Sequence, residues 1–284
     1  MLSSSSSPAA RPWLGGRFPA VGLLRAASIV VFCGAWEIAG RVPISLVFPS
    51  FLETVEALLR MTLDGRMPRA YSFTLEPLVI GVGLSALFGV AAGVVMGLSR
   101  PFEWFGAPLF VVMQAAPMAA LIPLVTFIYG IGVTAKVVSV IILAAPIIVL
   151  NAYKAVRNAN PSLIDMSRSF LGSRRQTVFK VIIPDASPLI FVGLRLGVAA
   201  GFIGVILAEL LITPTGVGDL ITYHGSVAEY PEMYAAILSI VLFAAIAVGL
   251  LERLEFILFR PEQRAAARAA GDTARPPEPR SALP

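Results

Sequence analysis

Charged residues are scarce in this sequence of 284 residues. They make up 14% of the chain, against roughly 25% in soluble domains, while 57% of the residues are hydrophobic. Cysteine and histidine are each present once, as Cys33 and His224. A single cysteine excludes an intrachain disulfide, and we interpret it as a small buried apolar residue. A single histidine with no cysteine nearby argues against a metal site. The composition predicts an integral membrane protein.

Sequence motifs for catalysis are also missing. The chain has no G-x-x-x-x-G-K-[ST] phosphate loop, no G-x-S-x-G elbow and no H-E-x-x-H pair. We therefore assign no catalytic residue, no metal ligand and no cofactor, and we expect any energy for active transport to come from a partner or an ion gradient. The net charge of +5 does not indicate nucleic-acid binding, because basic residues beside membrane spans are its commoner cause and no aromatic-basic groove pattern accompanies it.

What the chain does have is a series of long apolar runs. Since about 20 apolar residues cross a bilayer as a helix, the runs predict an all-α protein with about six transmembrane helices. The expected spans are 23–39, 78–98, 106–135, 137–153, 188–213 and 233–251. The third run is too long for one straight span, and Pro117 and Pro123 are the expected places for a break.

These spans form one expected transmembrane domain, residues 21–260, between two ends expected to be disordered and cytoplasmic, residues 1–20 and 261–284. If the N-terminus is cytoplasmic, most of the 22 Lys and Arg residues fall on the cytoplasmic side, as the positive-inside rule requires. Both termini are then cytoplasmic, and Lys136 is one of the few basic residues in the outer loops. In the outer loop 41–72, Ser50 and Glu53 predict a capping box that starts an amphipathic helix, either on the membrane surface or packed on the spans.

Polar residues at membrane depth usually face a protein interior or water. Met113, Gln114 and Pro117 lie where a broken span could free backbone groups to line a cavity. Glu209 near the end of the fifth span either reaches the outer interface or has a gating or ion-pair role. We assign these four residues to a translocation pathway. Arg195, near the cytoplasmic end of the same span, is expected to snorkel to the interface.

Small residues recur every four positions in two of the expected spans. Such stripes let helix backbones approach closely, and they predict tight packing between helices of one subunit. The residues are Ser85, Gly89, Gly93 and Gly97 in the second span, and Gly193, Gly197 and Gly201 in the fifth.

The segment from Asn160 to Pro184 is the one long polar and basic stretch between apolar runs. Asn160 predicts an N-cap, with a proline at the first helical position. Gly172 is placed to stop this short helix in a left-handed conformation. Ser173 and Gln176 then predict a capping box for a second, amphipathic helix that ends at Pro184. The sequence thus predicts a loop over residues 154–187 that contains a short helix, a Gly-Ser corner and an amphipathic helix.

This segment resembles the EAA loop of ABC transporter permeases, in which a Glu-Ala-Ala is followed by a glycine and a hydrophobic-x-hydrophobic-Pro close. Asp165 stands for the glutamate, Met166 and Ser167 for the alanines, and Pro184 for the last position. Aligned from Pro184, the family's glycine falls on Leu171, one place before Gly172. Stretches such as VFPSFLETVEALL, GLSRPFEWFGAPL, APMAALIPLVTFIYGIG and GVILAELLITPTGVGDLI extend the resemblance over most of the chain, to the nitrate, sulfonate and taurine branch.

The resemblance implies the permease subunit of a type I ABC importer in a bacterial inner membrane. The partners that it implies are a second permease subunit, expected to be an identical copy, two separate ABC ATPase subunits, a periplasmic binding protein and the lipid bilayer. The implied cargo is a small anion such as a sulfonate, taurine or nitrate, although related importers carry neutral or cationic heterocycles. The residues that it implies for ATPase coupling are Asp165, Ser167, Arg168, Ser169, Gly172, Ser173, Arg174 and Pro184.

Two other classes of protein are open to the composition. A self-sufficient secondary transporter or channel would require ionisable residues in several spans, and only Arg195, Glu209 and Glu37 at the edge of the first span are candidates. A membrane enzyme would require a paired catalytic constellation, which the sequence does not offer. An ATPase partner that is retained by the chain in mild detergent would separate the first class from these two.

Overall fold

The computed structural model describes residues 18–42, 47–212 and 214–259, and this part of the chain is built from helices without a strand. The expected disorder of residues 1–20 and 261–284 falls almost wholly outside the described residues. The helices are α1 Phe18–Arg41, α2 Phe51–Leu63, α3 Arg66–Leu98, α4 Arg100–Ala115, α5 Met118–Tyr129, α6 Val133–Arg157, α7 Pro161–Ser169, α8 Arg174–Thr177, the π-helix η1 Val178–Ile182, α9 Ile183–Leu211, α10 Val217–Ser226 and α11 Tyr230–Phe259.

Five helices in the described part are long and apolar enough to cross a membrane, and a sixth span results if α4 and α5 are counted as one bent pair. These two helices meet at an angle of 107°. The break lies at Pro117, because Ala116 before it takes the extended backbone that a following proline favours. Pro123 does not break the helix, since it lies inside α5. The expectation of an all-α protein with about six spans is confirmed.

Helix α6 is the central element, and the small-residue stripes of α3 and α9 pack against it. A Cβ added to Gly93 of α3 would lie 2.6 Å from Ala152 Cβ, and one added to Gly193 of α9 would lie 2.5 Å from Asn151 Cβ. Backbones this close leave no room for larger side chains. The predicted packing within one subunit is therefore confirmed.

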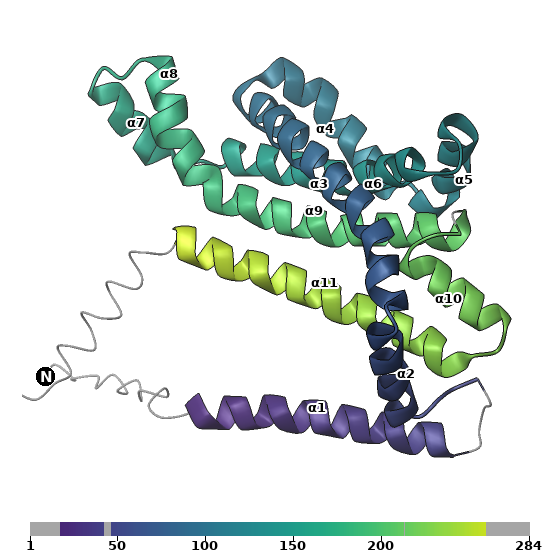
Figure 1. Ribbon diagram of the computed structural model, residues 1–284. Helices are drawn as coiled ribbons and strands as arrows, with labels where there is room; N and C mark the ends of the chain where they lie inside the picture. Colours follow the sequence, from purple (N-terminus) through teal and green to yellow (C-terminus); the bar gives the residue numbers. More distant parts are fainter. Residues whose placement is uncertain (1–17, 43–46, 213, 260–284) are drawn as a thin grey trace, which may run out of the picture.

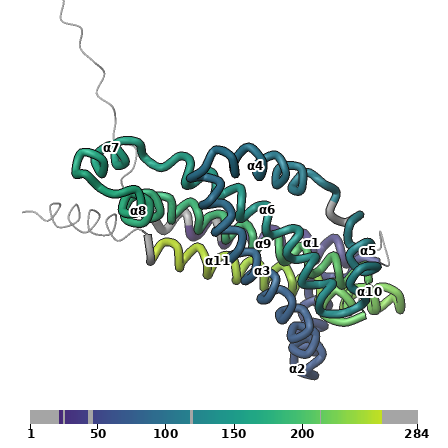
Figure 2. Tube along the Cα trace, turned by 90° about the horizontal axis from the view of Figure 1, so that it is seen from above, coloured from purple at the N-terminus to yellow at the C-terminus, as the bar shows by residue number. Residues whose placement is uncertain are grey.

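Figures 1 and 2 show how the elements divide between two ends of the molecule. The short helices α7 and α8 lie at one end, together with the last residues of α11, while α5 and α10 lie at the opposite end. Helix α1 also begins at the end that holds α7 (Figure 1). The positive-inside prediction places the start of α1, the segment with α7 and α8, and the end of α11 on one side of the membrane, and in the structure they lie at one end. The orientation of the molecule in a membrane stays a prediction.

The expected outer loop 41–72 is mostly helical. Ser50 Oγ accepts from the Glu53 amide at 3.3 Å, and the Ser50 amide donates to Glu53 Oε2 at 2.9 Å, so the predicted capping box is confirmed. Helix α2 then packs on the spans through Ala57 and Met61. The second span begins earlier than residue 78, because α3 starts at Arg66 and contains Pro77 within it.

Helix α1 is joined to the other helices mainly through aromatic residues at its C-terminal end. The ring of Trp36 lies 5.7 Å from that of Phe51 and 6.3 Å from that of Tyr234, and its Nε1 donates to the Pro49 carbonyl at 3.2 Å. Residues 22–24 and 26–32 of α1 are exposed in the isolated chain. Cys33 is accordingly half-buried, so its predicted burial is wrong.

Candidate functional site

The first turn of α7 is held by the residue that the sequence identifies as its cap. Asn160 Oδ1 accepts from the Ser162 amide at 3.0 Å, and Pro161 occupies the first helical position. The amide of Asn160 donates to Asp185 Oδ2 at 2.8 Å. The predicted N-cap is confirmed, and it also ties the start of α7 to the first turn of α9.

The end of α7 differs from the prediction. The left-handed residue is Leu171, with φ +56°, and not Gly172. The Gly172 amide donates to the Ser167 carbonyl and the Leu171 amide to the Arg168 carbonyl, both at 2.9 Å, which is the hydrogen-bond pattern of a Schellman motif. Gly172 instead permits a close approach of the backbone, because a Cβ there would lie 2.7 Å from Ser167 Oγ and 2.8 Å from Ser167 O.

The second helix starts as predicted and ends differently. The Ser173 amide donates to Gln176 Oε1 at 2.8 Å and Ser173 Oγ accepts from the Gln176 amide at 3.3 Å, so the capping box is confirmed. Pro184 does not end the helix, because α8, η1 and α9 run on as one helical stretch from Arg174 to Leu211. A π-turn inside an α-helix widens it, and here that turn lies just before the proline ring.

Helix α7 buries no residue of its own. The Asp165 and Arg168 side chains are 71% and 73% exposed and form a weak ion pair at 3.3 Å. Ser169 Oγ donates to the Asp165 carbonyl at 3.0 Å. Phe170 and Leu171, at the corner after α7, are also strongly exposed. The outward surface of the corner is thus both charged and apolar.

One side-chain contact braces α7 against the following helix. Ser167 Oγ and Thr177 Oγ1 lie 2.9 Å apart, and Thr177 is buried. A cavity of about 600 Å³ lies between this two-helix segment and the ends of α3 and α6. Its lining comes from Gly97, Leu98, Val156, Arg157, Ile164, Arg168, Gly172, Arg174, Thr177, Val178 and Ile182. Helix α7 therefore contacts α8 and η1 directly, while a cavity separates part of it from the ends of α3 and α6. We call residues 160–184 the coupling segment, after the role that the resemblance implies for them.

The residues predicted for a pathway lie in two places. Met113 is half-buried and Gln114 exposed near the end of α4, and Pro117 is the bend between α4 and α5. Glu209 lies near the end of α9 and is buried. The ion pair and the side-chain hydrogen bonds that the structure gives Glu209 go to Thr74, Lys136 and Gly218. The pathway role of all four residues stays a prediction.

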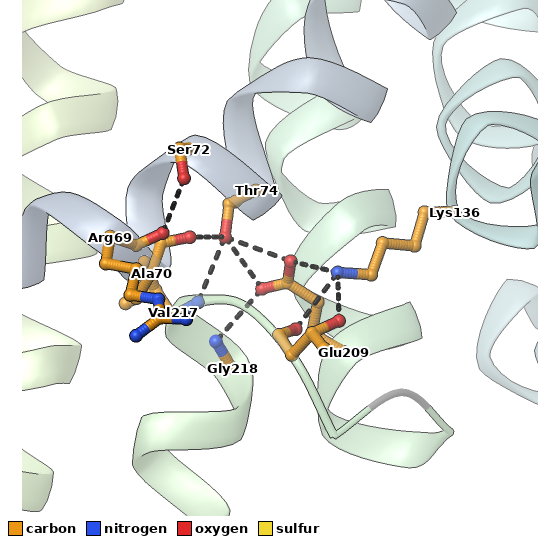
Figure 3. A network of polar contacts seen from close by, with 9 residues as sticks. Arg69, Ala70, Ser72, Thr74, Lys136, Glu209, Val217 and Gly218 are labelled. Carbon is orange, nitrogen blue, oxygen red and sulfur yellow. Dashed lines mark hydrogen bonds and ion pairs between the residues drawn. The ribbon is translucent and has the colours of Figure 1, made fainter. Parts of the chain in front are cut away.

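Glu209 forms a buried ion pair with Lys136, which sequence reasoning placed in an outer loop. Lys136 Nζ lies 2.8 Å from Glu209 Oε1, and the two side chains are 3% and 0% exposed. Figure 3 shows Thr74, Lys136 and Glu209 pointing toward one another from three helices. In the sequence, Lys136 directly precedes the apolar run 137–153, and Glu209 lies near the end of the run 188–213. Both positions are predicted to lie on the outer side, and this was the signal for the pair.

Further hydrogen bonds complete what we call the Lys136–Glu209 network, formed by Thr74, Lys136, Glu209, Thr215, Val217 and Gly218. Lys136 Nζ also donates to the Thr215 carbonyl at 3.0 Å and to Thr215 Oγ1 at 3.1 Å. Thr74 Oγ1 donates to Glu209 at 2.9 Å. Such pairing is what a buried charge requires, because an unpaired one costs several kcal/mol.

Arg195 does not snorkel alone to an interface. Its Nη1 lies 3.5 Å from Glu252 Oε1 and 3.6 Å from Glu255 Oε2, so it forms ion pairs that join α9 to α11.

His224 is buried and its Nδ1 lies 2.7 Å from Glu229 Oε2. No group of three or more potential metal ligands occurs among the residues described.

The fold and the coupling segment define a multi-pass helical membrane subunit with an exposed, braced two-helix device at one end. The family described as binding-protein-dependent transport system inner membrane component matches residues 85–259. The chain belongs to this family. It is thus the permease subunit of a binding-protein-dependent ABC transport system.

Two curated relatives are permease proteins. The chain is 26% identical over 218 residues to the taurine transport system permease protein TauC of Escherichia coli, covering 74% of this chain and 78% of the relative. It is 25% identical over 240 residues to the putative aliphatic sulfonates transport permease protein SsuC of Bacillus subtilis, covering 82% and 85%.

A solved structure shares the fold. A chain of the MetNI methionine ABC transporter, from a crystal form in an inward-facing conformation, is similar with a TM-score of 0.57 at 20% identity. The similarity covers 68% of this chain and 94% of that chain. The type I importer permease fold that the resemblance implied is confirmed.

Proposed function

We propose that the coupling segment docks on a separate ABC ATPase subunit, with Asp165, Ser167, Arg168, Ser169, Gly172, Ser173, Arg174 and Pro184 as the residues that carry coupling. The observation that carries the proposal is the exposure of α7, which is capped at both ends yet buries no residue in its own chain. A short helix with satisfied ends and a free surface is suited to insertion into a groove of a partner. Two permease subunits and two ATPase subunits would form the transporter.

Retention of the ATPase subunit in mild detergent tests the docking. Asp165→Lys reverses the charge on the exposed face of α7, and we expect it to abolish retention. Asp64→Lys is a matched control, because Asp64 is also an exposed carboxylate beside an arginine, with Asp64 Oδ2 2.7 Å from Arg66 Nε, at the opposite end of the molecule. Equal retention by both variants and the wild type would contradict the proposal.

The orientation that docking requires places α7 and both termini in the cytoplasm and α10 outside. Since the chain has one cysteine, Cys33, a Cys33→Ala background permits single-site labelling. In intact spheroplasts, a membrane-impermeant maleimide should label Ser226→Cys in α10 and leave Ser169→Cys in α7 unlabelled until the membrane is opened. The reverse pattern would overturn the orientation.

The proposed cargo is a small organic or inorganic anion such as a sulfonate, taurine or nitrate, delivered by a periplasmic binding protein. Support comes from the two permease relatives for taurine and aliphatic sulfonates, at 26% and 25% identity. The test is the thermal shift of the cognate binding protein with taurine, an alkanesulfonate, nitrate and a cationic heterocycle. A shift with the heterocycle alone would contradict the proposal.

The alternative function, a self-sufficient transporter or channel, would require free ionisable groups along a path through the spans. The Lys136–Glu209 pair does not favour it, because all three ammonium donors of Lys136 have acceptors: one oxygen of Glu209 and two of Thr215. Transport by the purified chain alone in proteoliposomes under an ion gradient would favour the alternative.

A further inference from the structure

The N-terminus of α10 is capped by side chains from two other helices. Its N-cap, Gly216, has no side chain and takes a left-handed φ of +100°. The Val217 amide instead donates to Thr74 Oγ1 of α3, and the Gly218 amide to Glu209 Oε2 of α9, both at 3.0 Å. A carboxylate at this position also suits the positive end of the helix dipole. The start of α10 is therefore attached to α3 and α9 rather than to its own loop.

The approach of α10 to Glu209 is too close for any other residue at two positions. A Cβ on Gly218 would lie 2.5 Å from Glu209 Cβ, and one on Gly216 would overlap the Glu209 carboxylate. Lys136 of α6 neutralises that carboxylate and also binds Thr215 in the loop before α10. Three spans thus converge at the start of one short helix.

Helix α9 connects this network to the coupling segment. The helical stretch from Arg174 to Leu211 begins at the braced corner, where Thr177 contacts Ser167 of α7, and holds Glu209 in its last turn. Gly193, Gly197 and Gly204 of α9 pack directly on α6, so α6 and α9 form one close-packed unit. One continuous helical stretch therefore runs from the corner beside α7 to the far end of the molecule (Figure 1).

We propose that Lys136 and Glu209 are positioning residues that make α10 move together with α9, so that the state of the ATPase is expressed at the opposite end of the subunit. The proposal rests on the proposed docking of the coupling segment. In physical terms, the network is the link through which nucleotide binding on one side biases the position of a helix on the other.

The test is hydrogen exchange of the complex of this chain with its ATPase subunit in nanodiscs, nucleotide-free and trapped with ADP and vanadate. In the wild type we expect the amides of both α7–α8 and α10 to change their exchange between the two states. The variant Lys136→Met with Glu209→Met keeps the packing volume but removes the link, and a buried ion pair replaced in this way is often tolerated. We expect the α7–α8 response to remain and the α10 response to be lost.

Further variants separate positioning from stability. Lys136→Met with Glu209→Gln retains an acceptor for the Gly218 amide and should restore part of the α10 response. Thr74→Val removes one cap of α10 without touching a charge, and it tests the same link if the double Met variant does not fold. Arg195→Met with Glu255→Gln removes the ion pairs that Arg195 forms with α11 and should leave the α10 response intact.

Each outcome decides between the two proposals. An ATPase that is not retained, or α7–α8 amides that do not respond to trapping in the wild type, overturns the proposed docking. If α7–α8 responds but α10 does not respond in the wild type, the positioning role is overturned. The positioning role is also overturned if the α10 amides of the double Met variant exchange faster in both states and still respond to trapping. The network would then only stabilise α10.

Discussion

The amide of Gly172 donates a hydrogen bond of 2.9 Å to the carbonyl oxygen of Ser167, and this bond closes α7. Between these two residues, Leu171 adopts the left-handed conformation that leucine rarely takes. The strained residue stands at the position where the resemblance expects glycine, and the glycine stands where a side chain would collide with Ser167.

The first prediction concerns Leu171→Gly. Because glycine adopts φ +56° without steric strain, we expect this variant to stabilise the folded chain by about 1 kcal/mol in the free energy of unfolding. Thermal unfolding in nanodiscs measures the change. Leu59→Gly is the control: Leu59 is 58% exposed inside α2, so the same substitution should there destabilise by about 1 kcal/mol. Destabilisation at both sites would show that Leu171 is unstrained.

Gly172→Ala should have the opposite effect. The added Cβ lies 2.8 Å from the Ser167 carbonyl oxygen, so the corner must open and strain the Ser167–Thr177 contact. We expect a loss of about 1–3 kcal/mol, as for other overpacked sites. Gly83→Ala has no atom within 4 Å of its new Cβ and lies inside α3, so it should be neutral or slightly stabilising. A neutral Gly172→Ala would contradict the close approach.

The Lys136–Glu209 pair makes a prediction about charge reversal. Lys136→Met alone leaves Glu209 buried without its cation and should destabilise by about 3–5 kcal/mol. The exchanged pair, Lys136→Glu with Glu209→Lys, restores neutrality but should not restore stability. The Gly218 amide and the Thr74 hydroxyl both donate to the side chain of residue 209, and a lysine there offers them no acceptor. Unfolding of the single and exchanged variants measures this. Full recovery by the exchanged pair would show that only the charges matter.

The contact between α3 and α6 is tested by Gly93→Ala. Its Cβ would lie 2.6 Å from both Ala152 Cβ and the Val149 carbonyl oxygen, and the backbone oxygen cannot yield as a flexible side chain can. We expect a loss of about 1–3 kcal/mol. Gly249→Ala in α11, where nothing lies within 4 Å, is the matched control and should be close to neutral. Both variants are compared by thermal unfolding in nanodiscs, and equal stability of the two would argue against tight α3–α6 packing.

Several features could be predicted because their causes are local. The caps at Asn160, at Ser50 with Glu53 and at Ser173 with Gln176 each join residues two or three positions apart. The break at Pro117 follows from the backbone preference of the residue before a proline. The length of each apolar run similarly determines the number of spans.

Other features depended on which helices pack together. The carboxylates that pair with Arg195 lie on α11. The helix continues past Pro184 after a π-turn that no residue pattern predicts. The position of the left-handed residue was wrong by one place, because glycine preference pointed to Gly172 while the hydrogen bonds to Ser167 and Arg168 placed the turn at Leu171.

The sequence alone determined that this is a helical membrane protein, where its spans lie and where its short polar helix begins, because hydrophobic length and capping act over neighbouring residues. Only the tertiary structure decided that Lys136, 73 residues before Glu209, is its buried partner, and that both hold α10. The physical reason is that a buried charge must be paired, and the partner is determined by helix packing rather than by separation along the chain.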